Sequence, residues 1–418
     1  MNIWLERLFL LLIFSLGFMQ PGLKYAGMSL PATDFVFATL TLAFIIVCIS
    51  RRKDWVWDNS YILCGAFLLT MAASAALSVD PTLSWIKFAG TLYLVGLAVI
   101  SINLVDSAET IKRVVIVWLA ASTIVSAVAV VTVVLFYLDR DSAWHELFLH
   151  HYGSLPVGNY PRVQSTFIYP AMLCNYLSVG TLMIVGARRA GWINGRLVAG
   201  LLLLHLIAAA FTLTPGLGGF VAALALWAAW IFIDQGRVGL SSCAAGAGIG
   251  ALLLFTFVAA ISVWPVETSP YTFQILGARL DPTQRLLAWQ GAIGTFASDP
   301  VFGKGIGLGV ASVLFRAPSG QMQVLTDAHN TWLSVAGQSG MFGLAAVFAL
   351  TAHVIRRGWI SGSPSTGIDW IRRSLLIAFV GGFVLQGLVG SFEDSRHLWV
   401  LMGLMISIDR VRRSELPV

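Results

Sequence analysis

Charged side chains are scarce in this sequence, and their scarcity excludes an ordinary soluble fold. Asp, Glu, Lys and Arg make up 11% of the 418 residues, whereas a soluble domain carries about 25% charged residues. Apolar residues make up 57%, and the mean hydropathy is +0.82. The composition therefore predicts an all-α polytopic membrane protein, with one membrane domain over residues 1–418 and surrounding membrane lipids as its first partner.

Cysteine is also rare, and its placement argues against a cross-linked or metal-bound fold. The four residues Cys48, Cys64, Cys174 and Cys243 lie inside or at the edge of apolar stretches, without the spacing of metal ligands. We therefore expect small packing residues, with neither a disulfide framework nor a structural zinc site.

Long apolar runs are what the sequence has in abundance. Each is close to the roughly 20 residues that cross a bilayer as a helix, and the runs lack the alternation of barrel strands. We expect about twelve transmembrane helices. The runs lie near residues 8–23, 32–50, 60–78, 84–102, 113–137, 166–187, 197–213, 217–233, 239–264, 331–353, 374–391 and 398–409.

Basic residues are distributed unevenly over the loops between these runs. Seventeen of the 26 Lys and Arg residues lie at the N-terminus or in one alternating set of loops, eight lie in the other set, and Lys87 lies within a span. Basic loops stay in the cytoplasm, so the net charge of +6 indicates membrane orientation and no nucleic-acid partner. Both termini should be cytoplasmic. The long polar segment 265–330, between spans nine and ten, and a second segment, 138–165, should face outside.

The segment 265–330 holds four of the eight outside cations. Such cations are either ordinary surface charge or a site for an anionic substrate, and the sequence leaves both possibilities open. Start signals at Asp281 and Pro282 and a stop at Pro300 predict a helix within the segment. Arg285 and Trp289 would share one face of that helix.

Glycines punctuate the stretch from Gly303 to Gly309 that follows this helix. The stretch lacks the ending of a P-loop, so we interpret it as flexible backbone that lets a substrate approach.

Three further features have both a plain and a functional interpretation. His145 and His150 are five residues apart, which separates them on a helix, so we expect a partly helical surface segment and no metal. His205, inside span seven, should be a neutral, hydrogen-bonded packing residue. Glu393 and Asp394 either pair with nearby Arg396 at the surface or supply a carboxylate to the site.

An ordered set of residues resembles the O-antigen ligase and polymerase superfamily of membrane glycosyltransferases. The set covers about half of the chain. It comprises Arg162 with Phe167, Pro170 and Asn175; Arg285 with Trp289; Pro300, Gly303, Gly305 and Gly307; His329, Asn330 and Leu333; Gly337, Gly340 and Gly343; and Glu393 with Trp399 and Gly403.

One part of the family pattern is missing. The family commonly has Ser-Arg-Gly after span seven, and this sequence has Thr214, Pro215 and Gly216 there. If that arginine is needed, we expect Arg279 or Lys304 to replace it.

The resemblance implies glycan transfer on the periplasmic face of a bacterial inner membrane. The donor would be an undecaprenyl diphosphate-linked glycan. In a ligase, the interpretation we favour, the acceptor is the lipid A-core oligosaccharide; in a polymerase it is another lipid-linked repeat. An alternative of a different class is a transporter of a lipid-linked sugar or small anion, whose charges would line the middle of the spans.

The chemistry of such a transfer fits the residue types without a metal or another cofactor. A diphosphate leaving group needs fixed positive charge, which the planar guanidinium donors of Arg162 and Arg285 would supply. The acceptor hydroxyl needs a base near pH 7, and His329 is our candidate. We expect nearby cations to favour its neutral form. The residues expected to complete the binding site are Arg279, Lys304, Trp289, Asn330 and Glu393.

Overall fold

A computed structural model shows how the described parts of the chain are arranged. The described residues are 3–20, 22–25, 28–50, 53–139, 147–150, 162–234, 273–275, 278–280, 283–316, 322–359, 364 and 366–415.

The described residues form an all-α protein with a few short hairpins. Six of its helices are long and apolar enough to cross a membrane, namely α2, α4, α5, α6, α8 and α11. The helices are α1 (Ile3–Ser15), α2 (Ala32–Ile49), α3 (Ser60–Ala76), α4 (Pro81–Leu104), α5 (Ala108–Leu138), α6 (Pro170–Arg189), α7 (Gly195–Ala210), α8 (Gly216–Asp234), α10 (Thr283–Ser298), α11 (Thr331–Gly358), α12 (Gly367–Phe379) and α13 (Arg396–Glu415).

Eleven of the twelve apolar runs contain one of these helices, and the ninth run, 239–264, lies outside the described residues. Polar caps fix several of the starts. Asp80 accepts a hydrogen bond from the backbone of Leu83 at the start of α4, and Ser107 caps α5 in the same way. Each cap satisfies a backbone N–H that has no partner within its own helix.

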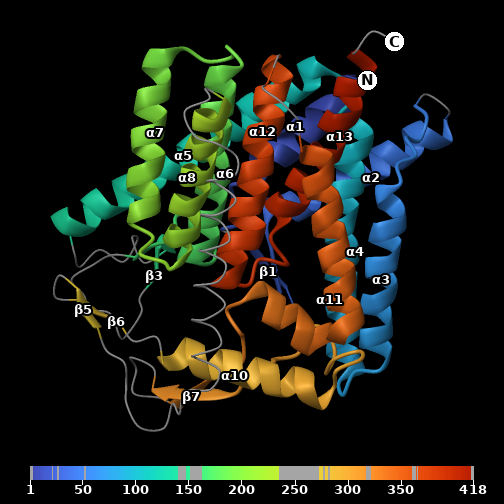
Figure 1. Ribbon diagram of the computed structural model, residues 1–418, viewed down its shortest axis with the longest axis vertical. Helices are drawn as coiled ribbons and strands as arrows, with labels where there is room; N and C mark the ends of the chain where they lie inside the picture. The colour runs from blue at the N-terminus through green and yellow to red at the C-terminus, as the bar shows by residue number, and fades with distance from the viewer. Residues whose placement is uncertain are drawn as a thin grey trace.

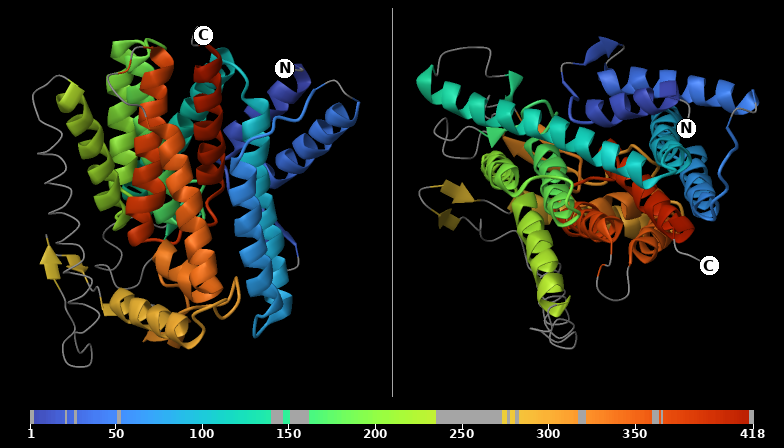
Figure 2. Two further views of the ribbon diagram at one scale, coloured as in Figure 1. Left: turned by 45° about the vertical axis from the view of Figure 1, so that its right-hand side comes forward. Right: turned by 90° about the horizontal axis from the view of Figure 1, so that it is seen from above.

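The helices form a bundle whose two ends differ (Figure 1). Both termini lie at one end, and α10 lies across the opposite end. The long helix α5 slants across the bundle and packs on α1, α6 and α7 (Figures 1 and 2). The helix predicted from Asp281 to Pro300 is confirmed as α10, and its position sets it against the beginning of α11.

Ion pairs between helices hold the end that carries the termini. Asp409 of α13 forms ion pairs with Arg357 of α11 at 3.1 Å and with Arg372 of α12 at 2.7 Å. Arg357 also bonds Asp58, just before α3, at 2.8 Å, and Arg373 pairs with Asp234 at the end of α8. The basic residues that set the predicted orientation therefore also join helices far apart in the sequence.

Helix α12 loses its regular form as it approaches the other end. A π-helical turn, Val380–Leu385, is followed by a 3-10 turn, Gln386–Leu388, and then by irregular backbone up to α13. Such turns inside helices are frequent at functional sites. The predicted uninterrupted span over 374–391 is therefore wrong in detail, because the chain unwinds before residue 391.

Short antiparallel hairpins account for the strands. They pair β1 (Leu23–Tyr25) with β2 (Met28–Leu30), β3 (Leu149–His150) with β4 (Arg162–Val163), β5 (Phe273–Ile275) with β6 (Ala278–Leu280), and β7 (Val313–Arg316) with β8 (Met322–Leu325).

The second polar segment, 138–165, differs from its prediction. His150 stands opposite Arg162 in the β3–β4 pair, so the expected surface helix is wrong at this point. A strand forms because residues 162 to 164 bond both Phe148 and the end of α7: Val163 donates to the carbonyl of Phe211 and Gln164 to that of Phe148. His145 lies outside the described residues.

The placement of the bundle ends generates a test of orientation. In a background without the native cysteines, Ser298→Cys on α10 should react with a membrane-impermeant maleimide added to intact cells. Asp54→Cys, in the loop between α2 and α3, should react after the cells are opened. The reason is that basic loops are retained in the cytoplasm. Labelling of Asp54→Cys but not Ser298→Cys in intact cells would reverse the orientation.

Candidate functional site

The site is built where the unwound end of α12 meets the start of α11. The N–H of Thr331 and its hydroxyl each donate to the carbonyl of Gly390 at 3.0 Å. The N–H of Phe392 in turn donates to the Thr331 hydroxyl at 2.8 Å. One threonine at the first turn of α11 therefore fixes the backbone of the segment 388–394, which we call the crossing segment.

Asn330 is the N-cap of α11. Its side-chain oxygen accepts from the N–H groups of Trp332 and Leu333 at 3.0 and 3.1 Å, and its amide nitrogen donates to the carbonyl of Leu388 at 3.0 Å. Both the oxygen and the nitrogen of the side-chain amide are therefore bonded to backbone groups of the protein. The structure shows Asn330 as the cap of α11, and its role in substrate binding stays a prediction.

His329 stands next to Asp327 immediately before this cap. Its Nδ1 lies 3.1 Å from a carboxylate oxygen of Asp327, and its backbone N–H donates to the other oxygen at 3.0 Å. The hydroxyl of Ser391, in the crossing segment, donates to that same oxygen at 2.6 Å. His329 has a φ of 49°, a conformation that is uncommon for residues other than glycine and is often found at functional sites.

This geometry determines which ring nitrogen of His329 can act as a base. With Nδ1–H donated to a carboxylate, the lone pair is on Nε2, and the ring is one-third exposed. We expected cations next to His329. This expectation is wrong, because the nearest charged neighbour of His329 is the Asp327 carboxylate. A carboxylate in this position holds the ring in one orientation and stabilises the positive charge that the ring gains with a proton.

Asp327 remains ionised at neutral pH. Burial raises the pKa of its carboxyl group, but hydrogen bonds from His329 and Ser391 and the charge of the His329 ring outweigh that effect, and the pKa falls to about 2. The stabilisation that comes with this lowered pKa is present above the usual value of 3.8 and is lost as the pH falls through about 2. The pairing with His329 is therefore maintained across the physiological range.

Arg285 reaches the crossing segment from α10. Its Nη1 donates to the carbonyl of Val389 at 2.6 Å, the residue between the two carbonyls that Asn330 and Thr331 bind. Trp289, one turn further along α10, has its indole N–H buried with no hydrogen-bond partner among the described residues. Both residues lie on α10, which packs on α11, and Arg285 reaches the crossing segment.

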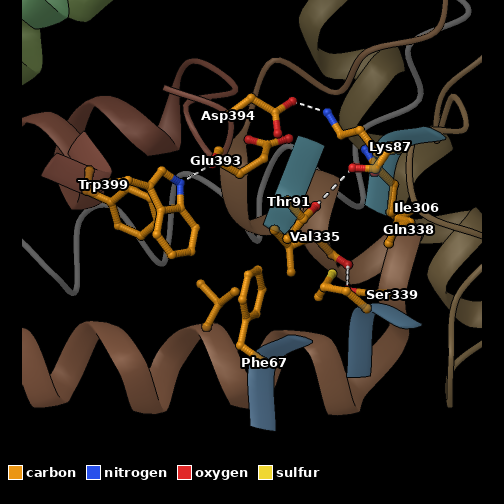
Figure 3. A pocket seen from close by; sticks show the side chains of 13 residues that line it. Phe67, Lys87, Thr91, Ile306, Val335, Gln338, Ser339, Glu393, Asp394 and Trp399 are labelled. Carbon is orange, nitrogen blue, oxygen red and sulfur yellow. Dashed lines mark hydrogen bonds and ion pairs between the residues drawn. The ribbon is translucent and has the colours of Figure 1, made fainter. Parts of the chain in front are cut away.

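Glu393 lies at the polar end of a pocket between α3, α4, α11 and α13 (Figure 3). One of its carboxyl oxygens accepts from the Ser334 hydroxyl at 2.7 Å, and the other is buried with no hydrogen-bond partner among the described residues. Burial first, and then the neighbouring Asp394 carboxylate, raise the pKa of Glu393 to about 7, against the opposing effects of Lys87 and Ser334. Glu393 can therefore gain or lose a proton near neutral pH.

The stretch from Gly303 to Gly309 packs against two helices. The backbone N–H of Gly305 donates to the Gln338 carbonyl at 3.0 Å, and that of Gly307 donates to the Gln338 side chain at 2.8 Å. A Cβ atom on Gly307 would lie 2.7 Å from the Cβ of Lys87 in α4. The expected flexible approach to a substrate is therefore wrong, because these glycines allow close contact between parts of the protein.

Gly340 interrupts α11 at the same place. Its φ of 66° breaks the helix, and a Cβ atom there would lie 2.3 Å from the carbonyl oxygen of Val301. The N–H of Met341 donates to the carbonyl of Pro300 at 2.8 Å. The end of α10 thus docks into the break in α11.

Two of the remaining predicted cations donate hydrogen bonds to backbone carbonyls outside the crossing segment. Lys304 donates to the carbonyl of Gly309 within the glycine-rich stretch at 3.3 Å. Arg162 donates to the carbonyl of Thr212, at the end of α7, at 3.4 Å. Arg279 stands opposite Gln274 in the β5–β6 hairpin, and its side chain lies outside the described residues. Arg162, not Lys304, is therefore next to the turn where the family arginine is missing.

Two expectations about ionisable residues have different outcomes. His205 is fully buried, and its two ring nitrogens lie 2.8 Å from the Leu201 carbonyl and 3.0 Å from the Ser122 hydroxyl. Its prediction as a hydrogen-bonded packing residue is confirmed. The surface pairing of Arg396 with Glu393 or Asp394 is wrong, because Arg396 binds Asp34 of α2 at 3.1 Å.

Sequence reasoning missed the partners of His329. Asp327 was visible two residues before the histidine, a spacing at which a carboxylate can bond both the backbone and the ring of a residue in a turn. Ser391 gave no such signal, because it lies 64 residues from Asp327. No known family model and no curated protein matches this sequence, so the family resemblance stays a prediction.

The raised pKa of Glu393 generates a prediction about stability. The folded protein binds this proton more tightly than the unfolded chain does, for which the usual value is 4.5. The resulting stabilisation is complete below about 4.5 and is lost as the pH rises through about 7. Thermal unfolding in detergent should therefore show a falling midpoint between these pH values, and Glu393→Gln should reduce the fall.

Glu109→Gln is the matched control, because Glu109 is an exposed residue in the first turn of α5. Its pH profile should follow the wild type. An unchanged fall in the Glu393→Gln variant would show that Glu393 does not titrate in this range.

Proposed function

We propose that this protein is a membrane glycosyltransferase in which His329, oriented by Asp327, is the general base. The observation that carries the proposal is the 3.1 Å contact between His329 Nδ1 and Asp327, which leaves Nε2 as the proton acceptor. The acceptor hydroxyl gives its proton to Nε2 as its oxygen attacks the anomeric carbon of the donor sugar. The bond from that carbon to the diphosphate oxygen breaks, and the diphosphate leaves with the electron pair.

The leaving diphosphate is assigned to arginine side chains. Arg285 is fixed beside the crossing segment by its bond to Val389, and that segment also carries Ser391, the partner of Asp327. Arg162 stands by the α7–α8 turn and takes the place of the arginine that the family has there. Two guanidinium groups would stabilise the negative charge that develops on the leaving group.

The bundle supports a membrane setting for this chemistry. Six helices of spanning length agree with a multi-pass protein, and the distribution of basic residues agrees with cytoplasmic termini and a periplasmic site in a bacterial inner membrane. The donor is then an undecaprenyl diphosphate-linked glycan, and the acceptor is the lipid A-core oligosaccharide, as in an O-antigen ligase. Twelve spans in total complete this proposal.

A transporter fits the described residues less well. Among the described residues, the buried Asp and Arg side chains gather at the end that carries the termini, where they form ion pairs with one another or with Asp234, Arg357 and Arg412; they are Asp58, Asp369, Arg372, Arg373 and Asp409. A transport path would instead place such charges along the middle of the spans.

Replacing His329 tests the base directly. His329→Ala should lower the rate of glycan transfer by roughly 10²- to 10⁴-fold, the usual effect of a positioned general base. Asp327→Asn should lower it less, because the imidazole remains. Binding of the lipid diphosphate donor should be retained in both. Transfer is measured with purified protein, separated donor and acceptor, and gel analysis of the product.

His353→Ala is the matched control, since His353 bonds Ser60 of α3 and its neighbour Arg357 belongs to the opposite end of the bundle. It should transfer at the wild-type rate. Full activity of a well-folded His329→Ala protein would place the base elsewhere.

Arginine geometry gives a second test. Arg285→Lys keeps the positive charge but loses the planar pair of donors, so the transfer rate should fall by at least about tenfold, the scale of one charge-assisted hydrogen bond. Arg162→Lys should behave similarly. Arg316→Lys, in β7, is the control and should be tolerated. Normal transfer by both test variants would show that these arginines are ordinary surface charges without a part in the transfer.

A further inference from the structure

Four consecutive residues of the crossing segment, 391–394, contact other elements. Ser391 donates to Asp327, the N–H of Phe392 donates to the Thr331 hydroxyl, and Glu393 accepts from Ser334. The fourth residue, Asp394, forms an ion pair with Lys87 of α4. The contact of Ser391 is with Asp327, which holds His329. The contact of Asp394 is with α4, whereas those of Phe392 and Glu393 are with α11.

Lys87 is also held at the base of its side chain. The backbone of Gly307 lies so close that a Cβ atom there would be 2.7 Å from Lys87 Cβ and 3.0 Å from its Cγ. Gly307 is in turn bonded to Gln338, which donates to Ser334 at 3.0 Å. A closed circuit of contacts thus links α4, the glycine-rich stretch, α11 and the crossing segment.

Lys87 and Asp394 lie at the same edge of the pocket as Glu393 (Figure 3). Their side chains are 31% and 50% exposed, and an ion pair with this exposure contributes little to overall stability. Its effect is therefore expected in the position of the crossing segment more than in the survival of the fold.

We propose that Lys87 is a positioning residue that holds the crossing segment, and through Ser391 and Asp327 orients His329 for proton transfer. This inference rests on the proposed function. Lys87 touches neither reacting group in this scheme; it fixes Asp394, which is the last residue of the crossing segment. Without that ion pair, residues 391–393 keep their hydrogen bonds to Asp327, Thr331 and Ser334, but the end of the segment is no longer tied to α4.

The test compares single variants with a charge exchange. Lys87→Met and Asp394→Asn should each lower kcat by roughly 10- to 100-fold, the scale of a small misplacement of a catalytic group, while KM for the lipid-linked donor stays near the wild-type value. The double variant Lys87→Asp with Asp394→Lys should recover most of kcat. Arg113→Met, which removes an exposed pair with Glu6, should behave as the wild type.

A second measurement does not depend on transferase activity. Carboethoxylation of His329 by diethyl pyrocarbonate, followed by peptide mass spectrometry, reports how the imidazole is held. Its rate should change in Lys87→Met and return toward the wild-type rate in the charge exchange, with His353 as the internal reference. If wild-type protein transfers no glycan but this pattern holds, the proposed function fails and the positioning role stands.

Three results would overturn the proposal. Wild-type kcat in both single variants would show that the pair does not position the site. A raised donor KM with unchanged kcat would make Lys87 a binding residue instead. Failure of the charge exchange to recover either kcat or the carboethoxylation rate, in protein with a wild-type thermal midpoint, would show that charge pairing is not what matters.

Discussion

Backbone carbonyls that lose their helical partners are the constraint on which the site depends. Where α12 unwinds, residues 388–390 cannot bond within a helix, and an unpaired carbonyl among apolar helices is costly. The three carbonyls are bonded in order by Asn330, Arg285 and Thr331. The start of α11 and the face of α10 are thereby fixed to the same short stretch of chain. His329 and Arg285 both lie at this stretch, because Arg285 and Asn330, the neighbour of His329, bond its carbonyls.

The parts of the fold that the sequence predicts are those governed by local forces. Eleven of the twelve apolar runs overlap a helix, and six of these helices are long and apolar enough to cross a membrane, because length and composition alone favour such a helix. The start of α11 was predicted at Thr331, and α10 was predicted from its terminal signals. The break at Gly340 was not, because a helix break of this kind is imposed by the docking of residues 300 to 302 and leaves no local signal beyond one glycine.

The sequence named several residues that the structure brings together, but not the contacts that join them. His329 and Arg285 lie next to the crossing segment, and Glu393 is part of it. Two of the supporting contacts connect residues that are distant in sequence, namely Ser391 with Asp327 and Lys87 with Asp394. Pairings across 64 and 307 residues depend on how helices pack, which hydrophobic periodicity does not report. The same limit explains the glycine-rich stretch. Glycine allows close approach by any neighbour, and the sequence does not say whether that neighbour is a ligand or another helix.

Two carboxyl groups near residues 391–393 differ in how readily they bind a proton. Asp327, bonded by His329 and Ser391, keeps its charge at neutral pH, whereas burial raises the pKa of Glu393 to about 7. Under the proposed function, a diphosphate that leaves in this region would be repelled by two ionised carboxylates. A Glu393 that is partly protonated near neutral pH would reduce that repulsion, while Asp327 would keep the charge that orients the proposed base, His329. In that scheme, the difference between the two carboxyl pKa values is what allows an anionic leaving group and a histidine base to lie next to each other.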